Sequence, residues 1–426
     1  MSATLEECLI ELSKQTEDYW SSTATSDGNV GGTTIVDTEL SQKADDWVAD
    51  MTAYDRIMSG TYDLEERKVS SLASGTLTTL AHGGKILNDV EYEIHRIASA
   101  SEKRRALIWA LRASFPVLHK RIQDESKVIG NWLRNGSFDQ WASASYPDYW
   151  RVATVTATKS TTEPYVKFGS ACCKLDTAAG YMYSTNTLVP DLQELAGQTV
   201  TFSIQAWCDT ASALRLAVYD GTDTTYSDYH PGTSDWTKNS EPLEVTATIA
   251  DTPTSVDFRV YLASAAATAY VVDARVIGPM RHKVYIGDLG LDNDTPHFVS
   301  VERSSFSQTE PWRRISFKVD GAGYLHYASG LKNLRMRIEG QARLDFLASG
   351  VASELWTATV AINAAQLDYL VALAAYYLYR QKSLPTLSTG DRKPFAEARD
   401  GWQMEYMRRA RSAGMAQLPT GVDWGV

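Results

Sequence analysis

The chain has few cysteines, few prolines and no long apolar run, and each shortage excludes a class of protein. Its 426 residues include four cysteines, Cys8, Cys172, Cys173 and Cys208, too few for a disulfide framework. Cys172 and Cys173 are adjacent, so the sequence contains no CxxC zinc motif, and we interpret the cysteines as small buried apolar residues. The 27 glycines and 13 prolines are far below the content of a low-complexity or collagen-like chain.

Basic residues are also in short supply, with 41 Lys and Arg against 52 Asp and Glu and a formal net charge of −11. This excess of acid argues against a broad nucleic-acid-binding surface, which needs a positive potential. The longest apolar stretch, Leu367–Tyr379, includes Asp368 and is shorter than the ~18 residues of a membrane span, so we expect no membrane contact. Residues 1–14 contain early acids and no apolar core, so we expect no secretory signal and synthesis in a cytoplasm.

The patterns of catalytic sites are missing as well. The seven histidines form no HxH or HExxH motif, and no GxSxG or strand-linked GxGxxG pattern occurs. A Walker A reading of Gly84-Lys85 fails because Thr79 stands where the first glycine is needed. The run Leu291–Thr295 begins like a calcium loop but lacks its later ligands, which is typical of a turn. We therefore expect a chain that is not an enzyme and that has no cofactor apart from a metal ion considered below.

Helical patterns occur in both terminal parts of the chain. Residues 4–20, residues 89–125 and the segment after about residue 361 have apolar side chains at three- and four-residue spacing. Pro116 should break the second of these helices.

The apolar face of the segment 89–125 needs a partner. It contains Leu107, Leu111 and Leu118, and we expect these side chains to contact residues of Leu367–Leu378 or Phe395–Tyr406.

Strand patterns occupy the middle of the chain. Residues 33–80 indicate a small β subdomain. From Asn131 to Gly278, short alternating runs rich in Thr, Val, Tyr and Trp are separated by turn residues, which predicts a β-sandwich or jelly roll. The β character continues through residues 280–350.

These patterns predict an α+β multidomain protein with an α-helical core from the N- and C-terminal parts, a large inserted β-sandwich and smaller β regions. The expected boundaries are 1–130 for N-terminal helices with the small β subdomain, 131–279 for the jelly roll, 280–350 for a β-rich connecting region, and 351–426 for C-terminal helices and an extended tail packing on helix 103–123.

Residues 131–279 resemble jelly-roll carbohydrate-binding modules over about 150 residues. The motifs are, in order, Asn135–Asp139, Trp141, Pro147–Trp150, Phe168–Ala171, Leu195–Phe202 and Tyr270–Val276. In that family an acid of the opening motif and the Asp of the closing motif often hold a structural calcium ion. The resemblance therefore implies Asp139 and Asp273 as candidate ligands, with the hard oxygen donors that Ca²⁺ prefers.

The same resemblance implies binding of glycans through exposed aromatic side chains, which in a sandwich also serve as packing. The pool consists of Tyr181, Tyr183, Trp207, Tyr219, Tyr226, Tyr229 and Trp236, from which we select Tyr181, Tyr183, Trp207, Tyr229 and Trp236.

The flanks resemble the head-to-tail adaptor (connector) proteins of tailed bacteriophages. The resembling segments are Gly32–Asp37, Arg104–Arg112, Phe115–Leu118, Leu367–Arg380, Arg392–Phe395 and Trp402–Arg411. This resemblance implies a helical adaptor core in the virion neck, a homo-oligomeric ring of twelve copies, and partners among the portal, the downstream neck or tail proteins and passing double-stranded DNA. The interface candidates are Arg104, Arg105, Arg112, Trp402, Tyr406, Arg408, Arg409 and Trp424.

Three interpretations follow. The first is a structural adaptor that joins the portal to the tail and lines the DNA path, where an acidic chain repels passing DNA. The second is a virion surface or tail protein whose jelly roll binds host-cell glycans. The third is a carbohydrate-active enzyme or its accessory module. Basic clusters such as Lys103–Arg105 would be solvated helix faces or contacts with DNA or an acidic partner.

Overall fold

The computed structural model describes residues 2–43, 46–49, 53–167, 169–232, 234, 236, 242–279, 281–302, 312–328, 333–384 and 393–414. The chain divides into two compact units. Among the described residues, unit 1 comprises those up to residue 120 and those from residue 343 onward, and unit 2 comprises those from residue 121 to residue 342.

Unit 1 contains a helical core built from both ends of the chain. Its helices are α1 (Leu5–Gln15), α2 (Asp46–Ala49), α3 (Ala100–Ala113), α4 (Ala364–Ser383) and α5 (Lys393–Ala413). Capping boxes start three of them, because Thr4, Ser99 and Asn363 each accept a hydrogen bond from the N3 amide while the N3 side chain binds back.

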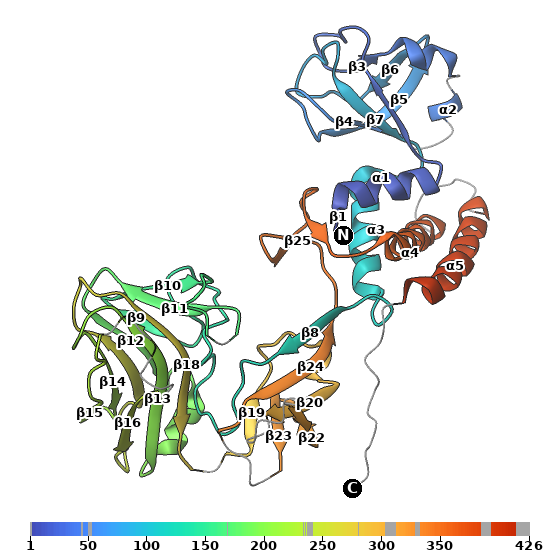
Figure 1. Ribbon diagram of the computed structural model, residues 1–426. Coiled ribbons are helices and arrows are strands. Elements are labelled where there is room, and N and C mark those ends of the chain that lie inside the picture. The colour runs from blue at the N-terminus through green and yellow to red at the C-terminus, as the bar shows by residue number, and fades with distance from the viewer. Residues whose placement is uncertain are drawn as a thin grey trace. The chain divides into compact units, whose positions relative to one another are not determined.

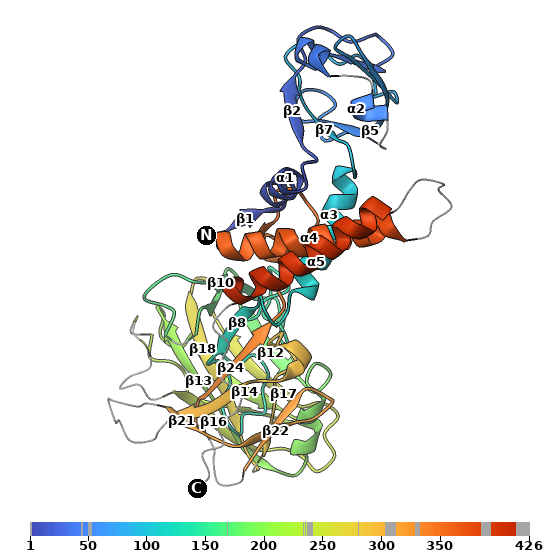
Figure 2. The same ribbon diagram turned by 90° about the vertical axis from the view of Figure 1, so that its right-hand side faces the viewer.

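One hydrophobic cluster joins these helices. Leu107, Leu111 and Leu118 share it with Leu370 of α4, and Trp402 of α5 packs against it. Helices α4 and α5 lie side by side in two perpendicular views (Figures 1 and 2). The helices of the two chain ends therefore bury one common apolar core.

The rest of unit 1 is β structure. A six-stranded sheet has the order β2-β7-β4-β5-β6-β3, with strands Trp20–Thr23, Glu91–His95, Tyr54–Ile57, Glu66–Ala73, Thr76–Thr79 and Thr34–Val36. A smaller sheet has the order β1-β27-β25-β26, with strands Ala3–Thr4, Thr359–Val360, Leu347–Ala348 and Val351–Ala352. A 3₁₀ turn, Thr38–Gln42, follows β3.

Buried charges connect the six-stranded sheet to the helices within unit 1. Arg56 of β4 binds Glu6 of α1 at 2.7 Å and Glu93 of β7 at 3.3 Å. Lys103 of α3 binds Asp18 at 2.9 Å, and both side chains are fully buried. Each buried charge thus has a partner of opposite sign, as burial requires.

Unit 2 contains a β-sandwich of two five-stranded antiparallel sheets. The first has the order β10-β11-β18-β13-β16, with strands Thr156–Ser160, Cys172–Asp176, Ala269–Ile277, Thr199–Cys208 and Leu243–Thr248. The second has the order β15-β14-β17-β12-β9, with strands Thr224–Tyr226, Leu214–Tyr219, Asp257–Leu262, Gly180–Thr185 and Arg151–Ala153. A 3₁₀ turn, Pro190–Leu195, precedes β13.

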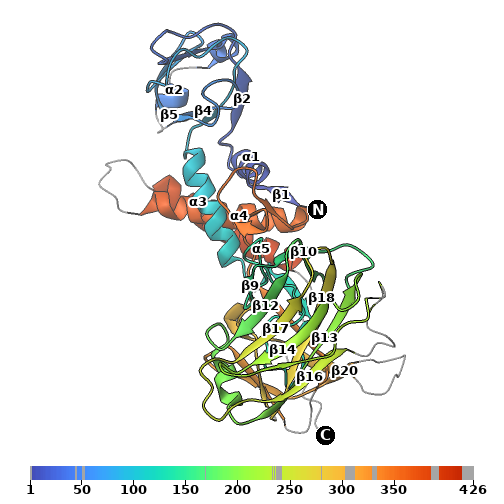
Figure 3. The same ribbon diagram turned by 90° about the vertical axis from the view of Figure 1, so that its left-hand side faces the viewer.

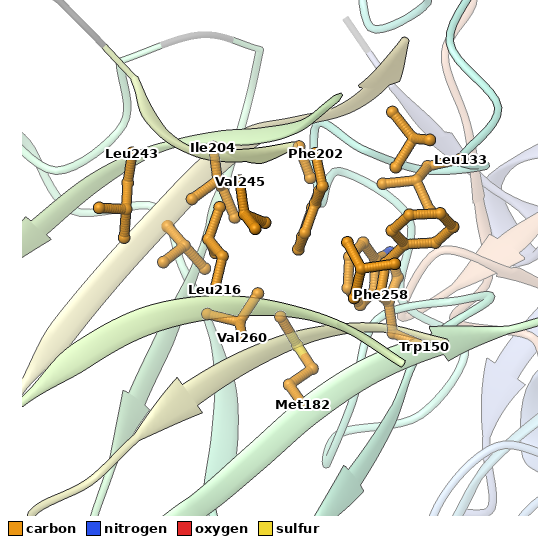
Figure 4. Close-up of a cluster of buried hydrophobic side chains, with 14 of the residues drawn as sticks. Leu133, Trp150, Met182, Phe202, Ile204, Leu216, Leu243, Val245, Phe258 and Val260 are labelled. Atoms are coloured by element: carbon orange, nitrogen blue, oxygen red, sulfur yellow. The ribbon is translucent and has the colours of Figure 1, made fainter. Parts of the chain in front are cut away.

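Apolar side chains from alternate positions of both sheets fill the space between them. Figure 4 shows Phe202 and Ile204 of the first sheet on one side and Phe258 and Val260 of the second on the other. Trp150 is fully buried beside Phe138, with ring centroids 5.1 Å apart. This alternation leaves the intervening side chains of every strand on the two outer faces.

A second, smaller β module of unit 2 has its own core. It contains the sheets β21-β20-β24-β8 and β19-β23-β22. Their strands are Trp312–Arg314, Phe298–Glu302, Met336–Ala342 and Lys120–Asp124 for the first sheet, and Lys283–Tyr285, Tyr324–Tyr327 and Phe317–Val319 for the second. A 3₁₀ turn, Asp292–Asp294, lies in the segment predicted as a turn.

The predicted fold class, an α-helical core carrying one inserted sandwich, is wrong. Strands account for 35% and helices for 22% of the described residues, which form six sheets and five helices. The segment 89–125 is only partly helical, because Glu91–His95 and Lys120–Asp124 pair as strands with distant segments. The small β subdomain also reaches beyond 33–80, since β2 and β7 complete its sheet. Within the described residues, no helix combines the length and apolar character of a membrane span.

Candidate carbohydrate-binding face

The outer face of the second sheet of the sandwich collects tyrosine and arginine side chains. Strand β17 shows why: Phe258, Val260 and Leu262 point into the core, so Arg259 and Tyr261 point outward. Figure 3 shows β12, β17 and β14 side by side in this sheet. We call the following set the tyrosine–arginine face: Tyr181, Tyr183, Arg215, Tyr219, Tyr226, Tyr229, Arg259 and Tyr261.

Strand register brings these residues together. Tyr261 of β17 lies opposite Tyr181 of β12 on one side and Arg215 of β14 on the other. One step along β17, Arg259 lies opposite Tyr183 of β12. Directly opposite side chains of antiparallel strands are in contact distance, so residues from three separate strands form continuous rows.

The aromatic rings contact one another without full stacking. The Tyr261 ring centroid lies 4.8 Å from that of Tyr181 and 5.7 Å from that of Tyr226. Tyr226 and Tyr229 are 42% and 39% exposed, so parts of their rings face solvent. Burial and the neighbouring Tyr261 raise the pKa of Tyr226, so its hydroxyl stays protonated at neutral pH.

Two arginines hold the rings in place. The guanidinium carbon of Arg259 lies 3.9 Å from the Tyr219 ring centroid and 4.9 Å from that of Tyr181. Arg259 also binds Asp257 at 2.6 Å, which neutralises its charge. The guanidinium carbon of Arg215 lies 3.7 Å from the Tyr226 centroid and 4.8 Å from that of Tyr229. Such cation–π contacts keep an aromatic surface rigid.

A cleft of about 790 Å³ opens beside the β9 edge of this sheet. Arg151, which lies opposite Tyr183 in the register, lines both the cleft and the end of the face. Its guanidinium carbon lies 4.6 Å from the Tyr146 ring centroid. The remaining lining residues are Gln140, Ala142, Ser143, Asp148, Tyr149, Thr187, Leu188 and Asp288. An aromatic surface that ends in a cleft suits an extended ligand with apolar and hydroxyl faces, such as a sugar chain.

The glycan candidates selected from the sequence lie on both sheets. Tyr181, Tyr183 and Tyr229 belong to the tyrosine–arginine face. Trp207 belongs to the first sheet, and Trp236 forms a β-bridge with it.

The aromatic side chains of the first sheet pack on each other. Tyr165 stacks on Tyr270 with ring centroids 3.8 Å apart and planes inclined by 6°. Trp207 contacts both rings edge-on, at 5.1 Å from Tyr165 and 5.5 Å from Tyr270. One ring face each of Tyr165 and Tyr270 is therefore used for internal packing.

Arg215, Arg259 and Tyr261 were absent from the sequence-based candidates. The signal that could have found them is their position in β14 and β17, where each lies between two apolar core residues. The resemblance implied aromatic side chains only, so it gave no reason to select the arginines that contact them.

The two calcium candidates have other partners. Asp139 Oδ1 accepts hydrogen bonds from the Ser170 amide at 2.7 Å, the Ser170 hydroxyl and the Ala171 amide. Asp273 binds Arg275 at 2.6 Å and lies 3.5 Å from Arg335. A divalent cation at Asp273 would face two guanidinium groups, which would repel it. In the described part of the chain, no three His, Cys, Asp or Glu residues group as metal ligands. Calcium binding stays a prediction.

The interface candidates on α3 belong to unit 1. Arg112 binds Asp345 at 3.0 Å, and the Arg104 guanidinium lies 5.0 Å from the Trp356 ring centroid. Arg105 is exposed.

The remaining interface candidates are on or beyond α5. Trp402 and Tyr406 pack against the helical core. Arg408 and Arg409 each lie 2.6 Å from Glu405, and these arginines lower the pKa of Glu405 to about 2. Trp424 lies outside the described residues.

Comparison with known proteins returns fold similarity alone. No protein-family model and no curated protein sequence matches the chain. Among solved structures, the enzymatically active domain of tailspike protein 4 of bacteriophage CBA120 matches 35% of this chain at 14% identity and a TM-score of 0.27. This chain covers only 21% of that tailspike chain.

Carbohydrate-binding modules match over a similar share. The TmCBM61 module, solved with β-1,4-galactotriose, matches 34% of this chain and 97% of the module at 14% identity, with a TM-score of 0.26. The C-terminal family 22 module of Clostridium thermocellum Xyn10B matches 36% of this chain and 99% of the module at 16% identity, with a TM-score of 0.27.

Proposed function

We propose that the β-sandwich of unit 2 binds polysaccharide on its tyrosine–arginine face. Under this proposal the chain is a virion surface or tail protein, as the resemblance of its flanks to phage proteins suggests, and its ligands are host-cell glycans. The chain acts by binding, without catalysis. The similarity to solved structures is weak, so the proposal rests on the side chains of the face.

The observation that supports the proposal is the continuous row of partly exposed rings across the second sheet. Tyr181, Tyr261 and Tyr226 come from three different strands, and their neighbouring centroids are 4.8 and 5.7 Å apart. Sugars present C–H groups on one side and hydroxyls around the rim, so an aromatic surface edged by polar groups suits both. The neighbouring cleft extends the length over which a chain of sugars can be held.

The test compares two tyrosines on opposite outer faces of the same sandwich. Tyr261→Ala removes the centre of the tyrosine–arginine face, whereas Tyr270→Ala is the matched control on the first sheet. Loss of a central aromatic contact costs about 2 kcal/mol, roughly a 30-fold rise in Kd. Binding of the full-length chain to a polysaccharide panel would be measured by affinity electrophoresis and calorimetry.

The two variants separate the possible outcomes. The proposal predicts that Tyr261→Ala weakens binding while Tyr270→Ala leaves it unchanged, with both variants keeping the wild-type circular dichroism spectrum. If only Tyr270→Ala weakens glycan binding, the binding site lies on the first sheet, where the candidate Trp207 is located. A chain that binds no glycan at all would refute the proposal.

A role as a head-to-tail adaptor is a second candidate. The observation that favours it is the hydrophobic core that α3 shares with α4 and α5, which joins the two terminal parts of the chain. The test is the mass of the full-length chain by light scattering, alone and with the portal protein. A closed ring near twelve copies would support the adaptor, and a monomer that ignores the portal would exclude it.

A further inference from the structure

Arg215 is the unusual residue of the tyrosine–arginine face. It lies on β14, with its guanidinium carbon 3.7, 4.8 and 5.9 Å from the ring centroids of Tyr226, Tyr229 and Tyr261. Its Nε is buried and has no hydrogen-bond partner. Across the described residues, Arg215 has neither a hydrogen bond nor an ion pair, so a cation stands among three rings without an anion.

Arg259, on the neighbouring strand β17, is a second arginine of the same face whose partners can be compared with those of Arg215. It is equally surrounded by tyrosines, at 3.9 Å from the Tyr219 centroid and 4.9 Å from that of Tyr181. Its guanidinium, however, donates to Asp257 Oδ2 at 2.6 and 3.2 Å and to the Tyr261 hydroxyl at 3.3 Å. Two arginines on one face therefore differ in one respect: the charge of Arg259 is matched within the chain, and that of Arg215 is not.

The chemistry of the guanidinium group indicates which chemical group of a ligand could pair with Arg215. Its planar fork of N–H donors matches the two oxygens of a carboxylate, and such bidentate pairs are among the strong hydrogen bonds of proteins. The tyrosine rings hold the guanidinium through cation–π contacts, which leave its N–H groups available to a ligand. The Arg215 side chain is half-buried and its guanidinium has no acceptor among the described residues, so a carboxylate of a ligand would be its first acceptor.

We propose that the polysaccharide bound by this face is acidic, a chain containing uronate or other carboxylate-bearing sugars, and that Arg215 binds one carboxylate. This inference rests on the proposed function, because it names the ligand class of the same face. The tyrosines supply the contact with the sugar rings, and Arg215 supplies selection by charge. Since the whole chain has a net charge of −11, attraction of an acidic polymer has to come from such a local site.

The experiment uses pairs of polysaccharides that differ only at the carboxyl group. Polygalacturonate, alginate and hyaluronate would each be compared with the carboxyl-reduced polymer, and dextran sulfate with dextran would report general attraction to polyanions. Kd values for the full-length chain would be measured at two salt concentrations. We expect an acidic polymer to bind about tenfold or more tighter than its reduced form.

Substitutions of Arg215 test whether this residue causes the preference for acidic polymers. Arg215→Gln should remove the preference, so that this variant binds an acidic polymer and its reduced form with equal Kd, and Arg215→Lys should restore part of the preference. Lys174→Gln is the matched control, because it removes one positive charge from the first sheet and should leave the preference intact.

The outcomes separate this inference from the proposed function. Equal binding of acidic and reduced polymers overturns the inference and leaves polysaccharide binding in place. An acidic preference that survives Arg215→Gln, or a stronger preference for dextran sulfate than for every carboxylated polymer, also overturns it. Failure to bind any polymer counts against the proposed function itself.

Discussion

Replacement of Lys103 by methionine should strongly destabilise unit 1. The Lys103 side chain is fully buried, and its Nζ lies 2.9 Å from both Asp18 Oδ2 and Ser13 Oγ and 3.0 Å from His95 Nδ1. Methionine keeps the apolar stem but leaves the Asp18 carboxylate buried without its cation. Breaking a buried pair from one side costs about 3–5 kcal/mol. For a unit of this size the loss corresponds to a fall of roughly 6–20 °C in melting temperature.

The same side chain gives this unit a dependence on alkaline pH. Burial, partly opposed by Asp18, lowers the pKa of Lys103 below its ordinary value of 10.5. The unfolded chain then binds more protons than the folded chain between these two pKa values, so stability should rise with pH in that window. Lys103→Met should abolish this rise.

Scanning calorimetry of the full-length chain is the assay, with unit 2 as the internal reference. Lys14→Met, on the exposed side of α1, is the matched control and should change stability by less than about 0.5 kcal/mol. Adding Asp18→Asn to Lys103→Met should recover part of the loss, because the unpaired carboxylate is then gone. A loss below about 1 kcal/mol for Lys103→Met would refute the reasoning, since a buried pair cannot be broken at so small a cost.

Four further predictions concern stability and reactivity. Leu111→Ala, in the helical core, should cost about 2–5 kcal/mol in denaturant unfolding, and a cost below 1 kcal/mol would contradict its burial. Phe258→Ala should cost about 3–5 kcal/mol and lower the melting temperature of unit 2 while sparing unit 1. Because the pKa of Glu405 is lowered from 4.5 to about 2, its contribution should be lost as the pH falls through that range, and Glu405→Gln should flatten the acid part of a melting-temperature profile. Burial raises the pKa of Cys8 to about 12 and that of Cys172 to about 11, so thiol reagents at pH 8 should label neither until denaturant is added.

The strands of the sandwich could be predicted because their pattern is local. Residues 199–208 alternate apolar and polar side chains, and β13 spans Thr199–Cys208 with alternate residues buried. The prediction of a helix over 89–125 was wrong at both ends. The segments there are short, and their apolar and polar residues follow no clear helical or strand spacing. Glu91–His95 became a strand by pairing with β2 and β4, which are distant in sequence. Such pairing overrides local preference and cannot be read from one segment.

The candidate site depends on the same non-local information. Tyr181 and Tyr261 are separated by eighty positions in the sequence and meet only because β12 and β17 pair in that register. The sequence could select Tyr181 as outward-facing, but it could not say which outward residues of other strands lie beside it. Trp207, selected by the same criterion, lies on the other sheet.

The two outer faces of the sandwich show why an aromatic cluster alone does not define a sugar site. On the first sheet, Tyr165 covers the ring of Tyr270 with nearly parallel planes, so the ring face of Tyr270 is already occupied. On the second sheet, Tyr226 is covered on one side by Arg215 and is still 42% exposed. A sugar needs an exposed part of an aromatic ring and a polar group beside it, and Tyr226 with Arg215 supplies both on the second sheet. The same surface carries the unpaired Arg215 guanidinium, so the tyrosines that we propose to contact the sugar rings and the arginine that we propose to bind a carboxylate lie together.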